Sequence, residues 1–153
     1  MKKQLHILLL AATLFVGLSA QAQVKQFIGN TQALPPSPSG EFSVFSSITK
    51  YLTLGDAAAL SSWFAENLEV TVISSSRICS RKQATEIVRT FFESNTPRSF
   101  QVTHKASESN RKYLIGLLNA GGELFQVSIY ATSSGGDTYK IQQLNISRQS
   151  AAY

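Results

Sequence analysis

The chain has 153 residues, of which 43% are apolar, 10% aromatic and 15% charged, and its formal net charge is +5. This length and apolar content predict a single folded domain with a packed core, because disordered chains are poorer in apolar residues and richer in charge. One cysteine and two histidines exclude a disulfide framework and a zinc site built from cysteine and histidine alone.

The first 22 residues have the three parts of a secretory signal peptide. Two lysines open it, an apolar stretch follows over residues 5–18, and Ala20 and Ala22 precede a cleavage site between Ala22 and Gln23. The apolar stretch is shorter than the roughly 20 residues of a spanning helix, and an uncleaved anchor is the alternative. We therefore expect export to the periplasm or the extracellular medium, with no transmembrane segment in the mature chain.

Residues 23–40 are expected to be a flexible tether rich in proline and serine, because proline removes backbone donors and restricts its neighbours. The folded domain is predicted to span residues 41–148. Residues 149–153 are a polar tail.

About three helices are predicted near the start of the domain. Apolar residues recur at three- and four-residue steps over residues 42–52, and Gly55 with Asp56 predicts the end of this helix and the cap of a second one. The second helix is predicted over residues 57–66, with Trp63 and Phe64 on its apolar face.

A strand is predicted over residues 68–73, followed by a loop through residues 74–76. Ser80 and Gln83 then have the spacing of a capping box, in which each side chain bonds to the other residue's backbone N–H. The most regular apolar period in the chain follows over residues 84–92 and predicts the third helix.

After Pro97 the apolar period changes from 3.6 residues to 2, which predicts strands. The first of these strands is expected to place Phe100, Val102 and His104 on one face. Three more strands are predicted after it, with turns at residues 120–123 and 134–137. A shift of apolar phase before Leu144 predicts a bulge at Gln142 and Gln143. Helices followed by a strand meander predict an α+β domain with a curved, mainly antiparallel sheet.

Several short motifs are distributed over about residues 41–148. They consist of Gly55, Asp56, Trp63, Phe64, Cys79, Ser80, Gln83, Ala84, Phe91, Phe92, Pro97, Arg98, Ser99, Phe100, His104, Lys105, Tyr113, Ile115, Gly116, Gly121, Gly122, Phe125, Ile141, Gln142, Gln143 and Leu144. Together with the order of the predicted elements, these residues resemble the cone-shaped nuclear-transport-factor-2-like (cystatin-like) fold. More specifically, they resemble an uncharacterised family of short exported bacterial proteins, a domain of unknown function.

The resemblance implies the fold and no particular activity, since the wider fold includes isomerases, dehydratases, polyketide cyclases and many non-enzymes. Enzymes of the fold mostly hold an acid or base inside the cone. None of the nine acidic residues falls on a predicted core face. His104 is therefore the candidate general base, with Tyr113 or Tyr130 as hydrogen-bond donor. The alternative is a structural histidine.

Six aromatic residues are candidates to line an apolar ligand pocket in the cone, the alternative being ordinary core packing. Cys79 is a candidate reactive thiol, because cations and a helix N-terminus lie beside it and both favour a thiolate. Its alternative is a small apolar residue packed under a loop. The six pocket candidates are Phe45, Tyr51, Trp63, Phe64, Phe92 and Phe100.

These observations favour a non-catalytic ligand-binding or scaffold module. Its expected partners are a small apolar ligand or a second copy paired through the sheet, and we expect no cofactor, no metal and no nucleic acid. The alternative is a small isomerase- or cyclase-like enzyme that uses His104 with a tyrosine in the cone.

Overall fold

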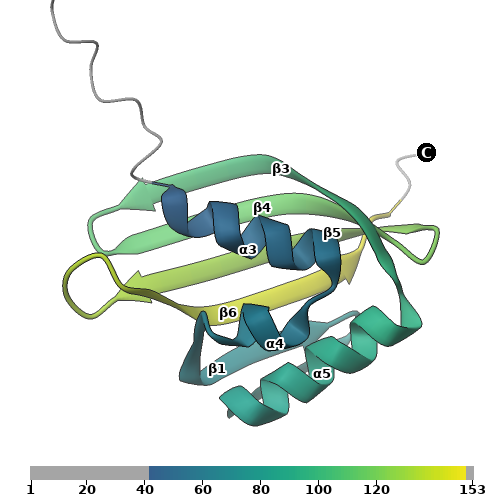
Figure 1. Ribbon diagram of the computed structural model, residues 1–153, viewed down its shortest axis with the longest axis horizontal. Helices are drawn as coiled ribbons and strands as arrows, with labels where there is room; N and C mark the ends of the chain where they lie inside the picture. Colours follow the sequence, from purple (N-terminus) through teal and green to yellow (C-terminus); the bar gives the residue numbers. More distant parts are fainter. Residues whose placement is uncertain (1–41, 151–153) are drawn as a thin grey trace, which may run out of the picture. The chain divides into compact units, whose positions relative to one another are not determined.

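The structure is a computed structural model that describes residues 42–150 (Figure 1). The predicted signal peptide, the tether and the last three residues of the tail lie outside the described residues. Within residues 42–150, no helix is long and apolar enough to cross a membrane.

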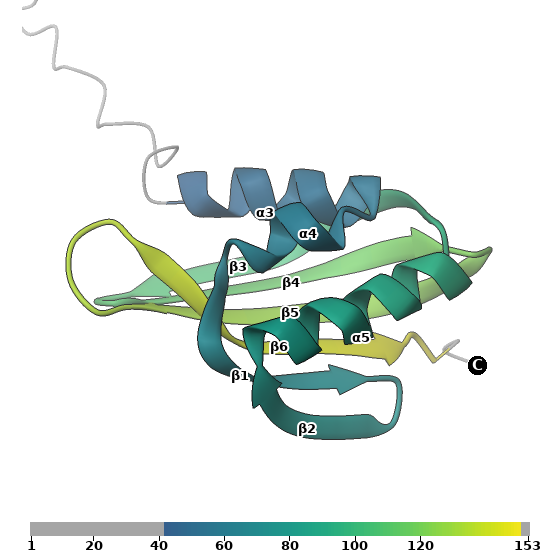
Figure 2. The same cartoon turned by 60° about the horizontal axis from the view of Figure 1, so that its bottom comes forward.

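The described residues form an α+β domain, as the sequence predicts. Three helices lie on one face of a curved sheet of six strands (Figures 1 and 2). In chain order the elements are α3 (Ser43–Leu54), α4 (Ala57–Ser61), β1 (Phe64–Val72), β2 (Ser75–Ser80), α5 (Arg81–Ser94), β3 (Pro97–Glu108), β4 (Arg111–Ala120), β5 (Glu123–Ser133) and β6 (Tyr139–Arg148).

The strand order across the sheet is β2-β1-β6-β5-β4-β3. The last four strands in the chain form an antiparallel meander, and β1 joins it through a parallel pairing with β6. β2 is the hairpin partner of β1 and lies at one edge of the sheet. α5 follows β2 and packs back over this end of the sheet, as Figure 2 shows.

The predicted junction between the first two helices is confirmed. Gly55 has φ 67°, and its N–H donates to the carbonyl groups of Leu52 and Tyr51, which ends α3. Asp56 then accepts a hydrogen bond from the Ala59 N–H at 2.9 Å and caps α4. Glycine suits this position because it adopts positive φ without a Cβ clash.

The second helix ends at Ser61, so its predicted extension to residue 66 is wrong. Phe64 opens β1 instead, is fully buried and pairs with Ile141 of β6. The Ile141 N–H donates to the Trp63 carbonyl at 2.7 Å. This partner is distant in sequence, and pairing with it outweighs the local helical spacing of Trp63 and Phe64.

β2 occupies residues for which the sequence predicted a loop. Most of its residues are exposed, because an edge strand has a neighbour on one side only. Its serines and Arg77 therefore show no apolar alternation. The capping box that follows is confirmed: Ser80 Oγ accepts from the Gln83 N–H at 3.3 Å, and Gln83 Oε1 accepts from the Ser80 N–H at 3.0 Å.

Two irregularities decide which way side chains point in the meander. The predicted bulge in the last strand is confirmed, because the pairing of β5 with β6 shifts register between Gln143 and Ile141. A second bulge lies in β3, where Val102 pairs with Gly116 but His104 pairs with Ile115. The extra residue is Thr103, and it turns His104 to the opposite face of the sheet.

Candidate ligand-binding groove

His104 does not share a face with Phe100 and Val102, so this expectation is wrong. Because of the bulge it is exposed on the sheet face that points away from the helices. Tyr113 and Tyr130 pair directly across β4 and β5 and are half-buried on the same outer face. The candidate base and its candidate donors therefore lie outside the cone.

The acidic residues of residues 42–150 are also outside the core. Glu69 accepts hydrogen bonds from Ser76 at 3.1 Å and from Gln143 at 3.0 Å on the outer face. Glu86 pairs with Arg89 on the exposed side of α5. In the part of the chain that the structure describes, no group of three histidine, cysteine or acidic residues could hold a metal ion.

The six aromatic candidates belong to the packed core or its margin. Phe45, Phe64 and Phe92 are buried members of one apolar cluster, and Tyr51, Trp63 and Phe100 pack against it. The core also contains Phe125, whose ring meets Phe91 edge-on with centroids 5.0 Å apart. These contacts favour the core-packing alternative for all six residues.

Cys79 is buried in β2 opposite Leu68. Burial raises the pKa of its thiol, and the nearby Arg77 guanidinium offsets this only in part. Burial of this kind disfavours the thiolate, which is the reactive form. The structure thus favours a small packed residue at this position over a reactive thiol.

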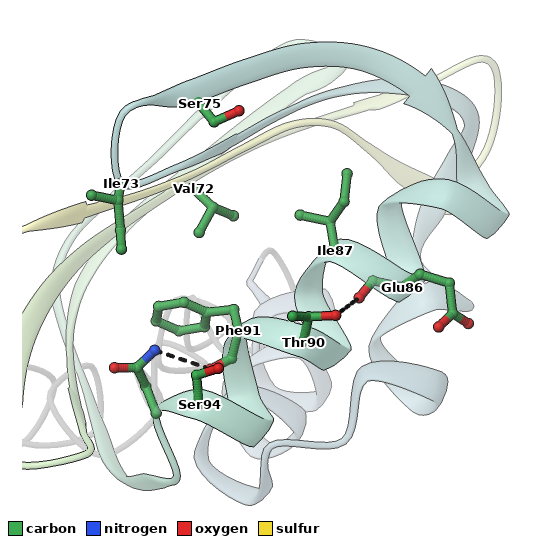
Figure 3. A pocket seen from close by; sticks show the side chains of 9 residues that line it. Val72, Ile73, Ser75, Glu86, Ile87, Thr90, Phe91 and Ser94 are labelled. Atoms are coloured by element: carbon green, nitrogen blue, oxygen red, sulfur yellow. Dashed lines mark hydrogen bonds between the residues drawn. The ribbon is translucent and has the colours of Figure 1, made fainter.

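A groove of about 460 Å³ lies between α5 and the turn of the β1–β2 hairpin (Figure 3). This volume is within the range of about 300–1,000 Å³ that is typical of small-molecule sites. Its apolar walls come from both elements, and its rim is polar. The lining residues are Val72, Ile73, Ser75, Glu86, Ile87, Thr90, Phe91, Ser94 and Asn95.

The helical repeat of α5 explains one wall of the groove. Ile87, Phe91 and Ser94 recur at steps of four and three, so they lie on one face of the helix. The polar groups beside them are satisfied locally: Thr90 donates to the Glu86 carbonyl at 2.9 Å and Asn95 to the Phe91 carbonyl at 3.2 Å. These bonds keep polar side chains at the rim and leave the apolar floor open, as Figure 3 shows.

The opposite wall contains a strained residue. Ile73 has φ 59°, a left-handed conformation that β-branched residues rarely adopt. It is the first residue of a two-residue turn between Val72 and Ser75, where glycine is normally preferred. Its N–H donates to the Ile146 carbonyl at 2.7 Å, and 41% of its surface is exposed at the mouth of the groove.

Sequence reasoning missed this groove because it did not predict β2. A tight turn at residues 73 and 74 is recognisable only when a strand is expected on both sides of it. The available signal was an isoleucine where the chain reverses. The groove also depends on α5 packing against the hairpin, which joins residues at least 11 positions apart.

The family model of a domain of unknown function, DUF4783, matches residues 45–147. The chain belongs to the DUF4783 family. The match covers almost the whole of the described domain and includes both elements that form the groove. No protein of curated function matches the chain.

Solved structures agree with this family and its fold. A DUF4783 protein from Bacteroides uniformis is similar with a TM-score of 0.66 and 18% identity, covering 69% of this chain and 97% of that one. A cystatin-like domain of unknown function from Nostoc punctiforme has a TM-score of 0.58 and 11% identity, covering 78% and 81%.

A putative dehydratase of the NTF2-like family from Streptomyces avermitilis has a TM-score of 0.55 and 12% identity, covering 76% of this chain and 100% of that one. At these identities the likeness shows the fold alone. The predicted fold and family are therefore confirmed: this DUF4783 domain has the nuclear-transport-factor-2-like architecture.

Proposed function

We propose that this DUF4783 domain is a non-catalytic binding module that takes a small apolar ligand in the groove between α5 and the β1–β2 turn. The observation that carries the proposal is Ile73. A β-branched residue at positive φ destabilises the turn by about 1–3 kcal/mol, which glycine or asparagine would avoid. The Ile73 side chain, which causes this strain, is partly exposed to solvent at the mouth of the groove.

The composition of the groove supports an uncharged ligand. Val72, Ile87 and Phe91 supply apolar surface below Ile73. Glu86 is the one acidic residue at the rim in the part of the chain that the structure describes, and it already pairs with Arg89. A ligand in the groove would remove the exposed parts of these side chains from water. Burying apolar surface in this way stabilises a complex by about 25 cal/mol per Å².

The neutral fluorophore N-phenyl-1-naphthylamine tests the proposal in a fluorescence titration. We expect saturable binding to the wild-type chain, weakened about 10-fold by Ile73→Asn because one apolar wall is lost. Thr90→Phe, which places a ring in the groove from an exposed position, should also reduce binding. Ile78→Asn is the matched control, since Ile78 is 81% exposed on β2 and is not among the residues that line this groove.

Two results would contradict the proposal. One is fluorophore binding that does not saturate. The other is equal affinity in the wild-type chain, Ile73→Asn and Thr90→Phe.

The predicted signal peptide supports a second part of the proposal, namely that the protein acts after export. Expressed in a bacterium with its own first residues, the chain should be recovered from the periplasm or the medium. Mass spectrometry should then find Gln23 as the first residue. Recovery of an intact chain in the membrane fraction would favour the uncleaved anchor instead.

The outer face of the sheet supports a homodimer as a further candidate. Ile115, Leu117, Tyr113 and Tyr130 are half-buried there, and no helix of residues 42–150 covers them. Light scattering after gel filtration should find a dimer that Leu117→Lys dissociates and Ser46→Lys, on α3 at the opposite face, does not. A monomer at every concentration would exclude this pairing.

A further inference from the structure

Lys112 is a buried lysine with no anionic partner among the described residues. It lies on the helix-facing side of β4, between Ser107 of β3 and Ala131 of β5, and is only 6% exposed. No carboxylate of residues 42–150 forms an ion pair with it, and none of the hydrogen bonds found among these residues involves its ammonium group. Burial of an ammonium group without a counter-charge is unfavourable.

Two aromatic rings and a second cation surround Lys112. Its Nζ lies 4.7 Å from the centre of the Tyr139 ring and 5.5 Å from that of Phe42. Lys105 Nζ lies 4.7 Å from the centre of the same Phe42 ring. Ring faces stabilise a cation, but they carry no formal negative charge that would pair with it.

A hollow of about 430 Å³ adjoins Lys112 at the start of α3. This hollow is mostly polar, unlike the groove beside α5, and the hollow and the groove share no lining residue. Asp137 is the one acidic residue in its wall among residues 42–150, and it forms no ion pair with Lys112. The lining residues are Ser43, Val44, Ser107, Ser109, Lys112, Asp137 and Tyr139.

The N-terminus of α3 opens into this hollow. Phe42 is its N-cap, so no side-chain oxygen caps the helix, and its first turn has no acidic residue. Ser43 and Val44, the first two residues of the helix, are in the wall of the hollow. Free N–H groups and the helix dipole favour an anion at such a place.

We propose that this hollow binds a small organic anion, with its carboxylate between the Lys112 ammonium and the first N–H groups of α3. A carboxylate has two acceptor oxygens, so one can accept from each donor set. The hydroxyls of Ser107 and Ser109 offer further donors. The site goes beyond the apolar groove proposed above and does not depend on it.

Sodium benzoate is a suitable probe, with benzyl alcohol as its uncharged counterpart. At constant ionic strength, benzoate should cause saturable shifts of the Ser43 and Val44 amide signals in ¹⁵N-NMR spectra, and benzyl alcohol should not. Lys112→Met should weaken benzoate binding about 10-fold or more, because it removes a charge-assisted hydrogen bond. Lys50→Met, an exposed lysine of the same helix, should bind like the wild-type chain.

The melting temperature separates this role from a purely structural one. If the role of Lys112 is to bind an anion, the Lys112→Met variant should melt at the same or a higher temperature than the wild-type chain when benzoate is absent. It should also lack the stabilisation that benzoate gives the wild-type chain. A variant that melts lower and binds benzoate normally would overturn the proposal, as would wild-type amides that do not respond.

Two other outcomes would also overturn it. Binding of inorganic phosphate in place of benzoate would contradict the carboxylate assignment. Benzoate binding only in Glu41→Gln would mean that the chain's own carboxylate, from a residue outside the described part, occupies the site.

Discussion

Two residues of this domain are in positions that are unfavourable for the stability of the fold, and the element that contains each residue does not explain its position. Ile73 is held at positive φ in a turn, and Lys112 is buried with no counter-charge paired to it among residues 42–150. Strained residues are concentrated at functional sites, so features of this kind motivate a proposal of ligand binding. Both residues lie at hollows, which is why we assign ligands to these two places and not to the filled core.

Ile73→Asn should raise the free energy of unfolding by about 1 kcal/mol, because asparagine adopts the left-handed conformation more readily than isoleucine. Chemical denaturation of the two chains measures this difference. Ile78→Asn, on the neighbouring strand, should give no such gain. If Ile73→Asn lowers stability instead, the packing of Ile73 outweighs its backbone strain.

The ends of the helices are specified by residues that lie close together in the sequence. The capping box at Ser80 and Gln83 satisfies backbone donors of α5 with side chains three residues apart, so no distant partner is needed. The junction at Gly55 and Asp56 is local in the same way. Both were predicted correctly for this reason.

Ser80→Ala should lower the free energy of unfolding by about 1 kcal/mol, since it removes the side-chain acceptor for the Gln83 N–H. Ser46→Ala, on the exposed side of α3, should change it little. Thermal or chemical denaturation measures both. Equal stability of the two variants would mean that solvent replaces the cap.

The residue type that a strand position accepts depends on the side chains of the neighbouring strand, as β3 and β4 show. Gly116 of β4 lies under the Phe100 ring, and a Cβ there would be 2.3 Å from a ring carbon and 2.8 Å from the Gln101 carbonyl oxygen. These are closer than side-chain atoms can approach, so the two strands require glycine at this position.

Gly116→Ala should therefore destabilise the domain by about 1–3 kcal/mol. Adding Phe100→Ala should recover only part of this loss, because the backbone oxygen remains in place. Denaturation of the single and double variants gives the coupling energy. Additive effects would show that the ring is not the source of the clash.

The whole domain has one apolar core, and all its buried members lie between Val44 and Ile146. Helices from the first half of the domain and strands from the second half contribute to it together. A chain of residues 40–150 should therefore unfold in one cooperative transition. Its melting temperature should match that of the chain from Gln23 within a few degrees, as circular dichroism can measure. Two separate transitions would show that the sheet and the helices do not form one cooperative unit.

The sequence by itself determined the α+β class, the end of α3 at Gly55, the start of α5 at Ser80, the bulge beside Gln142 and the family resemblance. These features depend on residues within a few positions of each other, or on a period that persists along a segment. Tertiary structure decided the role of Phe64, the existence of β2 and the face of His104. Each depends on a strand partner distant in the chain, and a single extra residue in β3 moves His104 from one face to the other. Both proposed ligand sites belong to this second group, because each is formed where the end or face of a helix packs beside another element, and local sequence does not specify that packing.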